Sequence, residues 1–109
     1  MRIFALLLLL ALWGGTASAQ QAGGKALYDR LCVACHGPLG LGDGAAAKAL
    51  KPPPTSFADA TFQAERTDEQ LVAAVTNGKP PMPPYGKQLS PAQIKELVGY
   101  IRQLGAQAK

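Results

Sequence analysis

Hydrophobic and polar positions alternate with a helical period in three segments of the chain. In residues 24–34, 67–77 and 90–104, apolar side chains fall on one face and polar or charged side chains on the other faces. This spacing predicts three amphipathic helices, of which the last has the longest stripe. The apolar positions are Leu27, Leu31 and Ala34 in the first segment, Leu71, Ala74 and Val75 in the second, and Ile94, Leu97, Val98, Ile101 and Leu104 in the third.

The second and third helices also have start and stop signals. Thr67–Gln70 and Ser90–Gln93 each have the pattern of a capping box, and Pro91 suits the first helical position. Gly78 and Gly105 follow the last apolar positions and are the expected stops. We therefore expect these two helices to end at about residues 77 and 104.

The rest of the chain carries weaker signals. Residues 45–50 form a candidate helical piece, which the prolines at 52–54 would end. No segment shows the sustained alternation of a strand, so the predicted fold class is all-α, with three main helices and short helical pieces. Three short helices with few aromatic residues make a thin core, and we expect another group to fill the middle of the molecule.

The N-terminal segment differs from the rest. Arg2 precedes an unbroken apolar run from Ile3 to Trp13, and Ala17-Ser18-Ala19 supplies a small-residue cleavage site. This pattern predicts a secretory signal peptide over residues 1–19 and one domain over residues 20–109. The apolar run is shorter than the roughly 20 residues of a membrane span, so a retained anchor is the weaker alternative. We expect a soluble, exported protein, which in a bacterium means the periplasm.

Size and charge exclude several classes of function. The 109 residues suffice for one domain, which excludes a large multi-domain enzyme. The formal net charge of the full chain is +4, and the basic residues are scattered rather than interleaved with aromatic residues or gathered along one helix. We therefore expect no nucleic acid partner.

The chemistry of the chain is concentrated in Cys32-Val33-Ala34-Cys35-His36. The pattern C-x-x-C-H is the covalent haem attachment signature. Each thiol can form a thioether with one haem vinyl group, and the adjacent imidazole can ligate the iron. The sequence therefore predicts one haem c, with Cys32 and Cys35 as attachment sites and His36 as an iron ligand.

Three other interpretations of the two cysteines compete with haem. A disulfide would close only a very small loop and would constrain the unfolded chain little. A dithiol oxidoreductase is expected to have a βαβ context, and no strand is predicted before Cys32. A structural zinc ion usually needs four protein ligands, and the chain has two cysteines and one histidine.

The second axial ligand is predicted by elimination. His36 is the only histidine, and Met82 is the only methionine after residue 1. A low-spin electron-transfer haem takes His with Met or a second His, which leaves Met82 as the soft donor. A lone methionine is often core filler, but Met82 stands among four prolines rather than on a helical face. Lys79 is the alternative ligand and would first have to lose a proton.

These motifs resemble those of the class I c-type cytochromes, in particular the small soluble bacterial monohaem proteins. The resemblance rests on CHGPLGLGDG at 35–44, PPPTSF at 52–57 and GKPPMPPYGKQLSPAQIKELVGYIRQL at 78–104, and covers nearly all of residues 23–104. It implies a small cytochrome c fold in which an N-terminal helix crosses a C-terminal helix, here with Gly24 and Tyr28 against Leu97 and Tyr100. It also implies single-electron transfer, with His36 proximal and Met82 distal.

The expected function is that of a soluble exported one-electron carrier. We do not expect an enzyme, because no open iron position or second histidine is apparent. A haem subunit of a larger oxidase or dehydrogenase complex is the main alternative, and a peroxidase or gas-binding protein is a weaker one. The expected partners are a protein that donates the electron and a protein that accepts it. We expect a monomer that contacts membranes only through complexes with these partners. Lys79, Lys87, Lys48 and Lys51 are candidate docking residues or ordinary solvated lysines.

Overall fold

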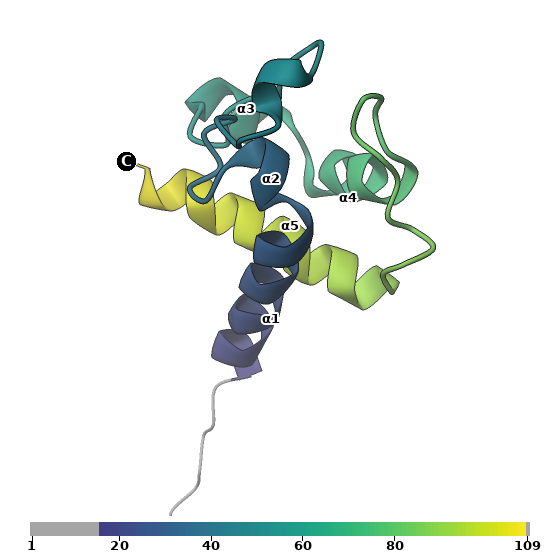
Figure 1. The fold of residues 1–109 in the computed structure, drawn as a ribbon. Coiled ribbons are helices and arrows are strands. Elements are labelled where there is room, and N and C mark those ends of the chain that lie inside the picture. Colours follow the sequence, from purple (N-terminus) through teal and green to yellow (C-terminus); the bar gives the residue numbers. More distant parts are fainter. Residues whose placement is uncertain (1–15, 109) are drawn as a thin grey trace, which may run out of the picture.

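The computed structural model describes residues 16–108, which form helices joined by loops (Figure 1). Within that range no β-strand occurs, and an isolated bridge pairs Lys79 with Met82. The predicted all-α fold class is therefore confirmed. The elements are α1 (Thr16–Leu31), α2 (Val33–His36), a 3-10 helix η1 (Ala47–Ala49), α3 (Ala60–Glu65), α4 (Asp68–Asn77) and α5 (Pro91–Gln107).

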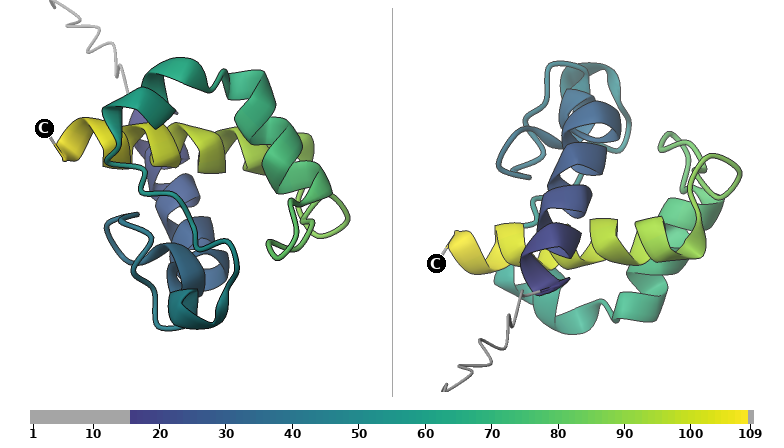
Figure 2. Two further views of the ribbon diagram at one scale, coloured as in Figure 1. Left: turned by 90° about the horizontal axis from the view of Figure 1, so that it is seen from above. Right: turned by 90° about the horizontal axis from the view of Figure 1, so that it is seen from below.

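The main contact of the fold is the crossing of α1 over α5, which both Figure 1 and Figure 2 show. A Cβ atom on Gly24 would press against the backbone oxygen of Glu96 and lie 3.0 Å from the Cβ of Tyr100. The Tyr28 and Tyr100 rings pack with their centroids 5.2 Å apart. Tyr28 and Leu97 are completely buried. The predicted contact between these two helices is confirmed, and glycine at position 24 is what lets them approach.

The two predicted capping boxes are present. The Thr67 side chain accepts a hydrogen bond from the backbone N–H of Gln70 at 3.1 Å, and the Gln70 side chain accepts one from the N–H of Thr67 at 2.9 Å. Ser90 and Gln93 make the same pair at 3.2 and 2.8 Å. Each box satisfies backbone donors that a helix start leaves free. The boundaries predicted for α4 and for the start of α5 are confirmed.

The first helix differs from its prediction at both ends. It begins at Thr16 rather than Gly24, and it stops at Leu31 rather than continuing to Ala34. Cys32 takes φ −117° and ψ −30°, and its carbonyl accepts hydrogen bonds from the N–H groups of both Cys35 and His36. The chain therefore tightens at Cys32 and starts a new helical turn, which a continuous apolar stripe does not reveal.

The end of the last helix was also predicted wrongly. Gly105 does not stop α5, which continues to Gln107. The glycine is needed for packing, because a Cβ there would lie 2.5 Å from the side-chain nitrogen of Gln63. Gln63 also donates to the carbonyl oxygens of Phe57 at 2.8 Å and Ile101 at 3.3 Å.

The two short helical elements η1 and α3 also differ from the predictions. Residues 45–50 contain only the single 3-10 turn η1, so the predicted helical piece is shorter than expected. Helix α3 was not predicted from its apolar spacing. Its start is fixed by Asp59, whose carboxylate accepts hydrogen bonds from the N–H groups of Thr61 at 2.8 Å and Phe62 at 3.1 Å.

The helices leave space between them, as the thin core led us to expect. Side chains of α1, α4 and α5 together with Phe57 make one buried cluster, and a cavity of about 460 Å³ lies against it. Among residues 16–108, no helix has the length and apolar character needed to cross a membrane. The signal peptide prediction concerns residues that lie mostly outside this range, with the expected cleavage site inside α1, and it stays a prediction.

Candidate cofactor site

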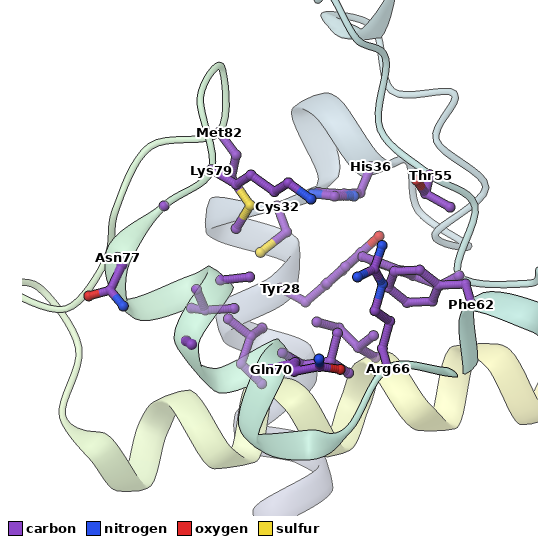
Figure 3. A pocket seen from close by; sticks show the side chains of 18 residues that line it. Tyr28, Cys32, His36, Thr55, Phe62, Arg66, Gln70, Asn77, Lys79 and Met82 are labelled. Atoms are coloured by element: carbon purple, nitrogen blue, oxygen red, sulfur yellow. The ribbon is translucent and has the colours of Figure 1, made fainter. Parts of the chain in front are cut away.

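The cavity of about 460 Å³ is where the predicted site residues meet (Figure 3). Cys32, His36 and Met82 line it together with residues of α1, α4 and α5. A second cavity of about 210 Å³ is lined by the same three residues and by Cys35. Segments 50 residues apart in the chain thus bring two thiols, an imidazole and a thioether around one region, whose size is within the roughly 300–1,000 Å³ usual for cofactor pockets.

The wall of the larger cavity is mainly apolar. Helix α4 contributes two small side chains, Ala73 and Ala74, beside Leu71 and Val75. Other apolar lining comes from Phe57, Phe62, Leu97 and Ile101. Such a wall suits a flat hydrophobic cofactor, because burying apolar surface on both partners is favourable.

His36 is held by packing rather than by hydrogen bonds. Its ring stacks on Phe57 with centroids 4.8 Å apart and planes 17° apart. Its Nδ1 atom is buried and has no hydrogen-bond partner in the structure. Burial lowers the pKa of His36, so the imidazole is neutral at pH 7. A neutral imidazole is the form that ligates a metal.

The two thiols are free and differ in their surroundings. Cys32 is buried, and Cys35 is half-buried. Burial, followed by the nearby Cys35, raises the pKa of the Cys32 thiol to about 11. A dithiol oxidoreductase needs a lowered thiol pKa instead. The raised pKa of Cys32 therefore does not support the dithiol interpretation.

Met82 lies in the loop between α4 and α5, and this loop is fixed to α4 at several points. Lys79 and Met82 exchange two backbone hydrogen bonds at 3.1 and 2.8 Å. Further along, the N–H of Tyr85 donates to the carbonyl of Val75 at 2.9 Å. Gly78 turns the chain with φ +73°, and a Cβ there would lie 2.8 Å from the carbonyl oxygen of Met82. The thioether is therefore held by a stiff loop.

Lys79 also reaches the site. It lines both cavities, and Figure 3 shows its side chain lying between Met82 and His36. It therefore remains the competing candidate for the second ligand position. Its ammonium group must be deprotonated before it can bind a metal, whereas the Met82 thioether can bind at any pH.

Two tyrosines bind backbone carbonyls around the site. The Tyr28 hydroxyl donates to the carbonyl of Gly37 at 2.6 Å, next to His36. The Tyr85 hydroxyl donates to the carbonyl of Leu31 at 3.2 Å. The half-buried Tyr85 ring also packs against the buried core.

Four polar side chains at the larger cavity were missed by the sequence analysis. They are Thr55, Arg66, Gln70 and Asn77. Arg66 stands just before the capping box of α4, at a position that helical periodicity does not mark. Only the fold of the α3–α4 corner brings it to the cavity.

The residues present fit a covalently bound haem. Both thiols, the imidazole with its unpartnered Nδ1 and the thioether border adjoining cavities with an apolar wall. A structural zinc site does not fit, because the described part of the chain has no group of three or more His, Cys, Asp or Glu side chains able to hold a metal ion.

Comparison with known proteins also supports a covalently bound haem. Residues 19–101 match the family described as cytochrome c oxidase, cbb3-type, subunit III. The chain is 38% identical over 99 residues to the cbb3-type cytochrome c oxidase subunit CcoP of Azospirillum sp. (strain B510), covering 88% of this chain and 33% of the relative. The chain thus spans about a third of the length of that relative.

A second relative is matched over most of its length. Cytochrome c6 of Gloeothece citriformis (strain PCC 7424) is 36% identical over 100 residues, which cover 91% of this chain and 86% of the relative. The solved structure of the KustC0563 c-type cytochrome is 32% identical, with a TM-score of 0.66 over 74% of this chain and 95% of that chain. The chain therefore belongs to the c-type cytochromes, as a small class I member of the cbb3-type subunit III family, with one covalently bound haem c as its cofactor.

Proposed function

We propose that this cytochrome is an exported one-electron carrier whose haem is attached through Cys32 and Cys35 and ligated by His36 and Met82. The observation that carries the proposal is that these four residues, which are the only sulfur and imidazole side chains of residues 23–108, all border the two adjoining cavities. Haem iron supplies a reversible couple between the ferric and ferrous states. The protein residues supply attachment, ligation and an apolar surrounding.

Each residue has a distinct part in this proposal. Cys32 at the start of α2 and Cys35 within it would hold the haem through two thioethers. His36 offers a neutral imidazole held in place by Phe57. Met82 offers a thioether on a loop whose backbone is tied to α4. Because Met ligation and an apolar surrounding both disfavour the additional charge of ferric iron, we expect a positive midpoint potential.

An electron carrier fits this site better than an enzyme does. With His36 and Met82 as its two ligands from the protein, the iron would have no open position for a substrate. His36 is also the only histidine in the sequence, so no distal base is available for peroxidase chemistry. A protein that binds carbon monoxide tightly without first losing Met82 would support the peroxidase or gas-binding alternative.

A haem subunit of a larger complex is the second candidate function. The similarity to CcoP, a subunit of a cytochrome c oxidase, favours it. The similarity to cytochrome c6 over 86% of that relative favours a carrier made of this domain. We favour the carrier, with a donor and an acceptor protein as partners. Native extracts distinguish the two, because a carrier elutes at the size of a monomer and a subunit co-elutes with an enzyme.

The experiment that tests the proposal uses the exported protein from a host with cytochrome c maturation. A pyridine haemochrome assay after acid-acetone extraction detects haem that stays attached, and Cys32→Ala with Cys35→Ala should abolish it. The weak red absorption band of thioether-ligated ferric iron should be present and should disappear in Met82→Ala. Attached haem without that band, or with a clearly negative midpoint potential, would exclude Met82 as the ligand.

The export and processing of the chain are tested by the same preparation. We expect the protein in the periplasmic fraction with Gln20 as its first residue, because Ala17-Ser18-Ala19 precedes it. N-terminal sequencing or intact mass distinguishes this from a retained anchor, which would keep residues 1–19 and leave the protein in the membrane fraction.

A further inference from the structure

The charged side chains at the two cavities have a single sign. Arg66 and Lys79 line the larger cavity, Lys79 also lines the smaller one, and no Asp or Glu among the described residues lines either. The other titratable side chains lining the larger cavity are Tyr28, Cys32 and His36, of which Cys32 and His36 are assigned to the haem in the proposed function. The region therefore favours an anionic group.

The two cations occupy different parts of this region. Lys79 lines the cavity where Cys32 and Cys35 meet, whereas Arg66 lines only the cavity that Cys35 does not reach. Figure 3 shows Arg66 entering from the side of Phe62 and Gln70, while Lys79 enters from the side of Met82. Arg66 therefore shares a cavity with Cys32 but not with Cys35, whereas Lys79 shares a cavity with both thiols.

The backbone of Arg66 is fixed by α5. Its N–H donates to the carbonyl of Phe62 at 3.1 Å, and its own carbonyl accepts a hydrogen bond from Arg102. Arg102 also donates to the carbonyl of Gln63 at 2.8 Å and pairs with Asp68 at 2.9 Å. These contacts hold the α3–α4 corner at one place over the cavity.

The same contacts leave the Arg66 side chain available. Asp68, the acidic residue that follows it most closely in the sequence, is engaged by Arg102. Among residues 23–108, the Arg66 guanidinium takes part in no ion pair, and the side chain is directed into the cavity in Figure 3. The guanidinium is therefore placed to bind an anionic group in the cavity.

We infer that the Arg66 guanidinium binds a propionate carboxylate of the haem and keeps it ionised, with Arg102 as the positioning residue. The inference rests on the proposed function. On a porphyrin, the two propionates lie on the edge remote from the vinyl groups that form thioethers, which matches the position of Arg66 relative to the two cysteines. A guanidinium binds a carboxylate through two parallel hydrogen bonds, which makes the pair specific in geometry as well as charge.

The test compares Arg66→Gln, Arg66→Lys and Arg30→Gln in the intact holoprotein. Arg30 is an exposed arginine that lines neither cavity, so its variant removes the same charge elsewhere. The midpoint potential is measured between about pH 5 and 9, where a carboxylate freed from its cation would titrate. A denaturant unfolding curve of each variant shows whether the fold is preserved.

We expect Arg66→Gln to shift the midpoint potential downward at the alkaline end, because a positive charge near the haem is lost. Its potential should then rise as the pH falls, because the unpaired carboxylate has a higher pKa and becomes neutral. Arg66→Lys should keep most of the wild-type profile, and Arg30→Gln should keep all of it. Arg66→Gln with the profile of Arg30→Gln would overturn the inference, including the case in which only its stability changes.

The same samples separate this inference from the proposed function. A protein without attached haem, or without the red thioether band, overturns the proposed function and the inference with it. A protein that has both, and whose potential does not respond to Arg66→Gln, overturns the inference alone. Arg102→Lys adds a check on positioning, since it should move the potential toward the Arg66→Gln value while leaving the red band unchanged.

Discussion

The hydroxyl of Tyr85 donates a hydrogen bond to the carbonyl oxygen of Leu31 at 3.2 Å, across 54 positions of the sequence. Leu31 is the last residue of α1, directly before Cys32, and Tyr85 follows Met82 in the loop between α4 and α5. This bond therefore connects the segment that carries the thiols and His36 with the segment that carries Met82. A backbone hydrogen bond from the N–H of Tyr85 to the carbonyl of Val75 fixes the same residue to α4.

Tyr85→Phe tests that connection. The ring keeps its packing and only the hydroxyl is lost, so we expect the free energy of unfolding to fall by about 0.5–1.5 kcal/mol. Because the loop is then less firmly held, imidazole should also displace Met82 faster. Denaturant unfolding and stopped-flow imidazole binding measure the two effects. Unchanged binding kinetics with lowered stability would show that the bond does not restrain the Met82 loop.

A side chain at position 24 should cause a steric clash where α1 crosses α5. A Cβ at this position meets the backbone of Glu96 and the Cβ of Tyr100, which cannot move without separating α1 from α5. Gly24→Ala should therefore lower the free energy of unfolding by about 1–3 kcal/mol.

Gly99 is the matched control for this prediction. It lies within α5, and a Cβ there would have no heavy atom within 4 Å. Gly99→Ala should raise the free energy of unfolding by about 0.5–1 kcal/mol through helix propensity alone. Two similar destabilisations, measured by thermal or denaturant unfolding, would contradict the close approach at Gly24.

Met82→Ala tests axial ligation. Without the thioether, the iron should accept carbon monoxide, cyanide or imidazole readily, and the midpoint potential should fall by on the order of 0.1 V, a fraction of the roughly 0.8 V that axial ligands span. Most helical signal should persist in circular dichroism, because Met82 lies in a loop outside the helices. A variant with wild-type potential would point to Lys79 as the ligand.

The lysines near the site are expected to assist the binding of an acidic redox partner. Lys79 lines both cavities and Lys87 is exposed on the same loop. Lys79→Gln combined with Lys87→Gln should slow electron transfer to an acidic partner at low salt by on the order of tenfold and flatten its dependence on ionic strength. Stopped-flow kinetics at several salt concentrations measure this. Lys95→Gln combined with Arg30→Gln, which removes two charges away from the cavities, should change the rate little.

The sequence predicted the elements that carry their own local signals. The capping boxes at Thr67 and Ser90 place the starts of α4 and α5 correctly, because each box satisfies its helix from within four residues. The break at Cys32 and the role of Gly105 depend on contacts with distant segments, such as Gln63 against Gly105. Periodicity describes one helix at a time and does not contain such contacts.

In the candidate site, too, the residues with a local sequence signal were predicted and those that depend on distant contacts were not. Cys32, Cys35 and His36 are named by a local motif, and Met82 follows because few other ligands exist in the chain. Their gathering around two cavities agrees with that prediction, while their roles as attachment sites and ligands stay proposals. Arg66 was not predicted, because it reaches the cavity only through the corner that Arg102 holds.

Ionisation of the buried Tyr28 hydroxyl should make the fold less stable at alkaline pH. Burial raises the pKa of its hydroxyl well above the ordinary value of 10, and the hydroxyl donates to the carbonyl of Gly37 at 2.6 Å. A group whose pKa is higher in the folded state stabilises the fold fully below its unfolded pKa. That contribution is lost as the pH rises from the unfolded toward the folded pKa. The free energy of unfolding should therefore decrease above about pH 10.

Tyr28→Phe should remove about 0.5–1.5 kcal/mol of stability at pH 7, because the bond to Gly37 is lost, and it should make the decline above about pH 10 shallower. Denaturant unfolding of both proteins between about pH 7 and 11 measures the two slopes. Tyr85→Phe is the comparison, since burial also raises the pKa of Tyr85 but this ring is only half-buried. Its slope should change less than that of Tyr28→Phe. Parallel slopes for wild type and Tyr28→Phe would mean that ionisation of Tyr28 does not limit alkaline stability.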